Sequence, residues 1–239
     1  WVTTGIADVL AITDYTHYWF PELPSFIPAL IVIGALLALN LPSVKNFGEI
    51  EFWFAMIKIV AICALIIVGA IMVATSFTTP SGAHAQVANL WNDGGFFPNG
   101  ATGFLGAFQI AVFAFMGSEL VGTTAAETQN PTVTLPKAIN SVPVRILIFY
   151  VGALVVILMV NPWREIDPAK SPFVTMFTLA GIAIAAHIVN VVVLTSATSS
   201  ANSGIFSTSR MVYGLSQEGY APKFLGNLSG SGVPRNALF

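Results

Sequence analysis

Three charged residues lie inside long apolar stretches of the sequence, where a side chain has no water to solvate it. Lys58 follows Phe-Ala-Met-Ile, Glu119 follows Phe-Met-Gly-Ser, and Asp8 follows Thr-Gly-Ile-Ala. Ionisable groups in such stretches are costly unless they pair with each other or line the path of an ion, a proton or a substrate. One base and two acids of this kind can bind and pass on a proton, so the sequence predicts Lys58, Asp8 and Glu119 as proton-coupling residues.

Lys58 allows two interpretations. Its long side chain can extend to the lipid headgroups at the nearer end of its helix. Alternatively, it faces the interior of a helix bundle and exchanges a proton there. We favour the second, because lysines inside apolar helices are rare without a function. Asp8 needs a partner as much as Lys58 does, whereas Asp14 lies nearer the end of its stretch and suits the membrane interface.

Glu119 lies two residues after Gly117, near the middle of its apolar stretch. Glycine permits a membrane helix to unwind, and the freed backbone groups can bind the charged ends of a small zwitterion. The alternative is close helix packing with a structurally hydrogen-bonded Glu119. We favour a discontinuous helix because of the carboxylate at this depth. The candidate substrate-binding residues are Phe113, Ala114, Phe115, Gly117, Ser118 and Glu119. The two phenylalanines are pocket walls or ordinary packing residues.

A polar face runs along residues 195–207, where serines recur at three- and four-residue spacing. Small hydroxyl residues of this kind serve tight helix packing or line an ion or substrate pathway, and the pattern supports both equally. Ser199, Ser200 and Asn202 are the candidate pathway-lining residues.

The elements that must hold these residues follow from the composition. Of 239 residues, 55% are hydrophobic and 8% are charged, against about 25% charged in an average soluble domain. The mean hydropathy is +0.79. This small number of charged side chains cannot cover the surface of a soluble protein of this length. We therefore expect the chain to lie in a lipid bilayer.

Several function classes are excluded. The net charge of −2 without a Lys/Arg cluster offers no surface for nucleic acid. The single cysteine, Cys63, cannot form an internal disulfide, and three widely spaced histidines suggest no metal site. There is no phosphate-binding loop, nucleophile motif or adjacent acid pair. We therefore expect no enzyme, no metal, no cofactor and no required protein partner; an uncoupled channel or receptor-like helical bundle stays an alternative.

Charge-free intervals locate the membrane crossings, each of which needs about 20 residues. They predict an all-α, multi-pass membrane protein with one transmembrane domain over residues 1–239. The predicted spans are 1–20, 26–42, 52–75, 103–125, 143–161 and 176–201, followed by an amphipathic cytoplasmic segment at about 205–218.

The basic residues of the predicted loops set the orientation. If 43–51, 126–145 and 203–239 face the cytoplasm, six basic residues lie inside and two outside, as the positive-inside rule requires. The inner six are Lys45, Lys137, Arg145, Arg210, Lys223 and Arg235, and the outer two are Arg164 and Lys170. The chain starts at Trp1 within an apolar stretch and stops at Phe239, so we expect a fragment truncated at both ends.

The sequence resembles the bacterial amino acid transporter family of the amino acid–polyamine–organocation (APC) superfamily. The resemblance rests on Phe115-x-Gly117-x-Glu119, on the segment 120–128 that follows it, and on a preceding lysine-bearing helix. It extends over 47–62, 90–95, 170–174 and 194–211. The loop motif at 90–95 and Lys170-Ser-Pro are similar to the branch of proton symporters for D-serine, D-alanine and glycine.

The resemblance implies a twelve-helix, five-plus-five inverted-repeat fold like that of LeuT. The six predicted spans would be helices three to eight, and Gly117 to Glu119 would match the break in helix six. Helix one, which supplies half the substrate site in the family, would lie outside this chain. Lys58 matches a helix-five lysine thought to occupy the place of a coupling sodium, and Asp8 matches an acidic position of helix three.

Together these features predict secondary active import of small neutral amino acids (glycine, D-alanine, D-serine) by proton symport with alternating access. The expected partners are the amino acid, protons and the bilayer, with the proton gradient as the energy source. The expected location is the bacterial cytoplasmic (inner) membrane. A permease of the same family for other amino acids, such as aromatic ones, is the alternative.

Overall fold

The computed structural model describes residues 1–41, 44–115, 117, 122, 128, 130–167, 171–182, 184–230 and 232–238, with only the backbone at 44–47, 113 and 114. The chain divides into two units. Unit 1 comprises residues 1–58, 119–135 and 190–239, and unit 2 comprises 59–118 and 136–189. Each unit is described by itself.

Among the described residues the secondary structure is helical, apart from an isolated β-bridge between Thr78 and His84. The α-helices are α1 (Val2–His17), α2 (Phe26–Asn40), α3 (Val44–Ala74), α4 (Gly100–Ala111), α6 (Pro131–Arg145), α7 (Gly152–Val160), α8 (Pro172–Leu179), α9 (Ala185–Gln217) and α10 (Arg235–Leu238). Short 3-10 segments are η1 (Val87–Leu90), η2 (Val112–Phe115), η5 (Trp163–Glu165) and η6 (Lys223–Gly226), and η4 (Ile146–Val151) is a π-helical turn.

Many large apolar side chains lie on the helix surfaces. In the described part of the chain, Gly48–Ala74 and Pro131–Val160 are long and apolar enough to cross a membrane, and Phe26–Asn40 is a shorter apolar helix. Large side chains such as Ile67, Ile71 and Leu154 are more than half exposed. Helices satisfy their own backbone polar groups, so apolar outer faces suit a lipid environment. The count of six spans stays a prediction.

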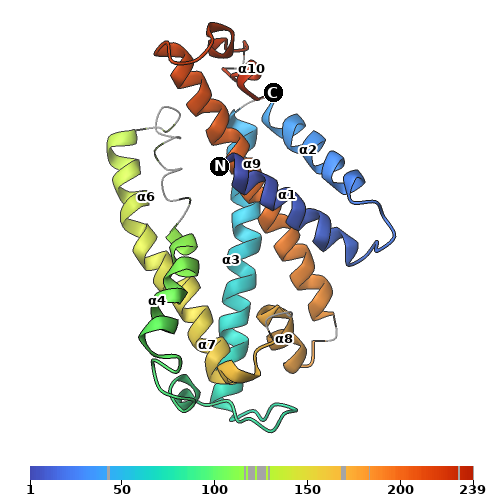
Figure 1. Cartoon of the computed structure of the whole chain (residues 1–239), viewed down its shortest axis with the longest axis vertical. Helices are drawn as coiled ribbons and strands as arrows, with labels where there is room; N and C mark the ends of the chain where they lie inside the picture. Colours follow the sequence, from blue (N-terminus) through green and yellow to red (C-terminus); the bar gives the residue numbers. More distant parts are fainter. Residues whose placement is uncertain are drawn as a thin grey trace. The chain divides into compact units, whose positions relative to one another are not determined.

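In unit 1, α1 and α2 pack side by side (Figure 1). Ile12 of α1 and Leu36 of α2 are buried, as are Ala201 and Phe206 of α9. Asn190, near the start of α9, donates from Nδ2 to the Tyr15 carbonyl oxygen over 2.8 Å. A side chain of α9 therefore ties it to the backbone of α1.

In unit 2, the C-terminal part of α3 packs against α7 and α8 at Gly69. A methyl group added at Gly69 would clash with Val156 and approach Met176. Leu65 and Met72, on either side of Gly69, are buried as well. Close packing at small residues is how helices associate in membranes, where burial from water gives no driving force.

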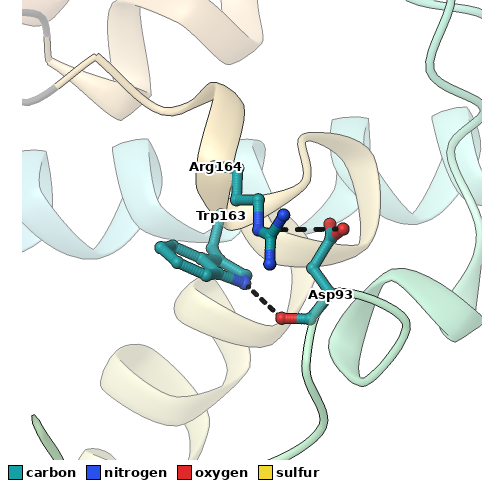
Figure 2. A network of polar contacts seen from close by, with 3 residues as sticks. All are labelled: Asp93, Trp163 and Arg164. Atoms are coloured by element: carbon teal, nitrogen blue, oxygen red, sulfur yellow. Dashed lines mark hydrogen bonds and ion pairs between the residues drawn. The ribbon is translucent and has the colours of Figure 1, made fainter. Parts of the chain in front are cut away.

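The loop between α3 and α4 is attached to the end of α7. Asn89 donates from Nδ2 to the carbonyl oxygens of His84 and Met159, over 2.9 and 2.8 Å. In Figure 2 the Trp163 indole N–H donates to the Asp93 carbonyl oxygen over 3.1 Å, and Arg164 lies 4.0 Å from the Asp93 carboxylate. The backbone-directed bonds hold the loop, since an exposed ion pair at 4.0 Å contributes little.

The last predicted span differs from the structure at both ends. The predicted helix over 176–201 is interrupted: α8 ends at Leu179, Gly181 has φ of 80°, and α9 begins at Ala185. The separate segment predicted at about 205–218 is the C-terminal part of α9, which continues to Gln217 (Figure 1). Within α9, the Thr198 hydroxyl donates to the Leu194 carbonyl oxygen one turn earlier over 2.8 Å, so this polar side chain has a partner inside its own helix.

Helix α3 also begins earlier than predicted, at Val44 instead of residue 52. The stretch 44–51, expected as an inner loop, is therefore helical. Glu51 and Lys58 are seven residues apart on one helix, which is close to two turns, so both lie on the same face.

Candidate functional site

A hydrogen-bonded polar cluster lies within unit 1, between α2, α3 and α9. It contains Asn40 of α2, Glu51 and Lys58 of α3, and Ser199 and Asn202 of α9. We call it the α3–α9 polar cluster. Three of its members are buried: Asn202 is 0% exposed, Ser199 2% and Asn40 6%. Glu51 and Lys58 are half-buried.

The centre of the cluster is the Ser199 hydroxyl. It accepts a 2.8 Å hydrogen bond from Lys58 Nζ and donates one of 2.7 Å to Glu51 Oε2. The hydroxyl therefore bridges an ammonium group and a carboxylate that are two helical turns apart on α3. Hydrogen bonds that involve a charged group are roughly twice as strong as neutral ones.

Asn202 holds the other oxygen of the same carboxylate. Its Nδ2 donates to Glu51 Oε1 over 3.1 Å, and its Oδ1 accepts from Asn40 Nδ2 over 2.7 Å. Asn40 Nδ2 also donates to the Leu36 carbonyl oxygen over 2.8 Å. Ser199 and Asn202 are three residues apart on α9 and so share a face, which explains why both reach Glu51.

Asp8 of α1 adds a second carboxylate to this region. The charges of Asp8 and Glu51 both act on Lys58, and Asp8 also interacts with the Ser200 hydroxyl. Asp8 Oδ2 is buried and has no hydrogen-bond partner among the described residues. The region therefore holds two acids for one base, and it can take up one proton more than a simple ion pair.

The structure brings together five of the residues predicted from sequence. Lys58, Ser199 and Asn202 belong to the α3–α9 polar cluster, and Asp8 interacts electrostatically with Lys58. Ser200, predicted with them, interacts with Asp8. The predicted proton-coupling and pathway-lining residues of α1, α3 and α9 thus lie near one another.

The predicted substrate-binding residues belong mostly to a segment that is described in part. Ser118 and Glu119 lie outside the described residues, and so do the side chains of Phe113 and Ala114. After Ala111 the α-helix gives way to the 3-10 turn η2, in which Phe115 is 58% exposed. Gly117 has φ of 94°, which an α-helix does not contain. This backbone agrees with the predicted discontinuity, while the binding roles stay predictions.

Two members of the polar cluster were not among the predicted site residues. Glu51 was expected in a loop, and Asn40 at the end of an apolar helix. The signal that points to Glu51 is its seven-residue spacing from Lys58, combined with the three-residue spacing of Ser199 and Asn202. Among the described residues, no group of three or more His, Cys, Asp or Glu side chains could hold a metal ion.

Comparison with known proteins links this chain to transporters. A family model described as amino acid permease matches residues 1–239. The chain is 61% identical over 238 residues to a D-serine/D-alanine/glycine transporter of Escherichia coli (strain K12), with 100% of this chain and 51% of that protein covered. It is 54% identical over 239 residues to the amino-acid permease AapA of Bacillus subtilis (strain 168), of which it covers 52%.

A more distant relative has a different substrate in its name. The aromatic amino acid transport protein AroP of Escherichia coli O6:H1 is 44% identical over 238 residues, with 100% of this chain and 52% of that protein covered. The chain spans about half the length of these curated relatives.

Proposed function

Since the chain belongs to the amino acid permease family along its whole length, we propose that the protein imports small neutral amino acids by proton symport. The family is one of membrane transporters. The proposed substrates are glycine, D-alanine and D-serine, because a relative named for these three amino acids is 61% identical. The proposed location is the bacterial cytoplasmic membrane, and the proton gradient is the energy source.

The observation that best supports proton coupling is the excess of acids around one base. Lys58 is hydrogen-bonded to Ser199, while Asp8 and Glu51 both act on its charge. With all three groups ionised, the region has one uncompensated negative charge, which a proton neutralises. Uptake or release of that proton changes which helices are tied together, and this is the kind of bias that drives a conformational cycle.

We propose that transport proceeds by alternating access within a twelve-helix, five-plus-five inverted-repeat fold, in which this chain supplies helices three to eight. Phe113, Ala114, Phe115, Gly117, Ser118 and Glu119 would bind the substrate, and Ser199, Ser200 and Asn202 would line the pathway. The left-handed backbone at Gly117 supports this, because unwound segments of discontinuous helices expose N–H and C=O groups to a substrate's charged ends.

The test is uptake of labelled glycine by the full-length protein in proteoliposomes. With an inward proton gradient, we expect glycine to accumulate above its external concentration and a protonophore to collapse this accumulation. Unlabelled D-alanine and D-serine should compete, and phenylalanine should not. Uptake that only equilibrates glycine would indicate uncoupled transport, and competition by phenylalanine would favour the aromatic alternative.

A further inference from the structure

The Ser199 hydroxyl stands between a proton donor and a proton acceptor in a continuous chain. Lys58 Nζ donates to Ser199 Oγ over 2.8 Å, and Ser199 Oγ donates to Glu51 Oε2 over 2.7 Å. Both bonds point in the same direction, from the lysine to the carboxylate. A hydroxyl that accepts on one side and donates on the other can pass a proton without moving, because it gains one proton as it gives up another.

We propose that Glu51 is the proton acceptor of Lys58 and that Ser199 relays the proton between them. The proposal rests on the proton symport proposed above and adds the group that receives the proton on its way to the cytoplasm. In the relay step, a proton moves from Lys58 Nζ to Ser199 Oγ while the original hydroxyl proton moves to Glu51 Oε2. The lysine becomes a neutral amine, the glutamate becomes a neutral carboxylic acid, and the serine ends with one proton as before.

The position of Glu51 on α3 makes it suitable as an exit group. It lies seven residues nearer the N-terminal end of the helix than Lys58, a distance of about 10 Å along the axis. In the predicted orientation this end of α3 faces the cytoplasm. Glu51 is half-buried, whereas Ser199 and Asn202 beside it are buried.

Asn202 and Asn40 act as positioning residues for the acceptor. Asn202 Nδ2 holds Oε1 of Glu51, which leaves Oε2 directed at the Ser199 hydroxyl. Asn40 in turn holds Asn202 by its Oδ1, so that its Nδ2 is the atom that faces the carboxylate. A relay needs a fixed donor–acceptor geometry, and these two buried amides provide it.

Asp8 is the competing acceptor. Its charge acts on Lys58, but its interaction partner is Ser200, and Lys58 donates to Ser199. Among the described groups, Asp8 and Glu51 are the charged side chains that act on Lys58. Of the two, Glu51 is the one connected to the lysine by hydrogen bonds through a single hydroxyl. The relay therefore runs to Glu51.

Two assays on the full-length protein in proteoliposomes separate the relay from transport itself. Counterflow of labelled against unlabelled glycine requires the alternating sites but no net proton movement, and an internal pH dye reports proton influx driven by glycine. For Glu51→Gln we expect counterflow to be retained and glycine-driven proton influx to fall by about tenfold or more, because a positioned proton-transfer group has been removed. Glu49→Gln, at an exposed position of the same helix, is the matched control and should leave both signals unchanged.

The role of the Ser199 hydroxyl in the relay is tested by a pair of substitutions at this residue. Ser199→Thr keeps the hydroxyl and should keep glycine-driven proton influx, whereas Ser199→Ala removes the hydroxyl and should lose it as Glu51→Gln does. Proton influx that persists in Glu51→Gln or in Ser199→Ala would overturn the relay. Loss in Asp8→Asn with retention in Glu51→Gln would make Asp8 the acceptor, which also overturns it.

If Glu51→Gln and Ser199→Ala both lose counterflow, an experiment on the unmodified protein tests the proposal. Infrared difference spectra with glycine, recorded on protein labelled with carbon-13 glutamate, should show an isotope-shifted band of a protonated carboxylic acid. Absence of that shift would refute protonation of a glutamate. Failure of the proposed function is a different result: the unmodified protein would then show no glycine-driven proton influx at all.

Discussion

Asn202 links two other members of the α3–α9 polar cluster, Glu51 and Asn40. It is fully buried and makes hydrogen bonds with both its amide nitrogen and its carbonyl oxygen, to Glu51 and Asn40. A buried polar group that loses its partner has no water to replace it. The cluster should therefore respond to a substitution at Asn202 as a unit.

We predict that Asn202→Ala destabilises the protein by about 1–3 kcal/mol, because it removes a bond to a charged carboxylate and leaves Asn40 with one partner fewer. Asn40→Ala should destabilise the protein less, by about 1 kcal/mol, since the group that loses its hydrogen-bond donor is a neutral amide oxygen. Thermal unfolding of both variants and of the double variant in detergent measures the effects. A double variant whose loss equals the sum of the single losses would contradict the coupling.

At the scale of elements, helix α3 contains both the charged groups of the polar cluster and a site of close helix packing. Helix α3 contains Glu51 and Lys58 in its N-terminal half, within unit 1, and Gly69 in its C-terminal half, within unit 2. The N-terminal half thus provides the charged groups of the cluster. The C-terminal half packs closely against α7 and α8.

We predict that Gly69→Ala destabilises the protein by about 1–3 kcal/mol, because its methyl group would occupy the space of the Val156 side chain. Adding Val156→Ala to the Gly69→Ala variant should restore part of the lost stability, because the smaller side chain leaves space for the new methyl group. Gly152→Ala is the matched control, since a methyl group there meets only ordinary contacts with Ile66 and Leu147. Thermal unfolding of the three variants tests this, and equal Tm values for Gly69→Ala and the unmodified protein would contradict the prediction.

At the scale of the whole molecule, the testable property is the orientation inferred from the loop charges. The predicted outer loop contains Asn92, and the predicted inner region contains Glu218 at the end of α9; both are exposed. This chain has one cysteine, Cys63, so within it the background for labelling needs the substitution Cys63→Ala.

In that background we predict that a cysteine replacing Asn92 reacts with a membrane-impermeant maleimide on intact cells. A cysteine replacing Glu218 should react only after the membrane is permeabilised. The physical reason is the excess of basic residues in the loops assigned to the inside. The reverse labelling pattern would invert the topology, and it would also place Glu51 at the outer end of α3.

The sequence by itself determined the helical class, the membrane environment and the family, and it identified Lys58, Asp8, Ser199, Ser200 and Asn202 as residues of interest. These conclusions need only local information: apolar stretches, isolated charges and motifs that can be read along the chain. The family predicted in this way is confirmed over residues 1–239.

Only the tertiary structure decided which polar groups meet. Glu51 and Ser199 are 148 positions apart, and Lys58 and Ser199 are 141 apart. Whether their side chains touch depends on the rotation and register of α3 and α9. An apolar pattern sets these weakly in a bilayer, because lipid and protein interiors are similarly apolar. The early start of α3, which brings Glu51 onto the face of Lys58, and the uninterrupted course of α9 past Asn202 were likewise not predicted from the sequence.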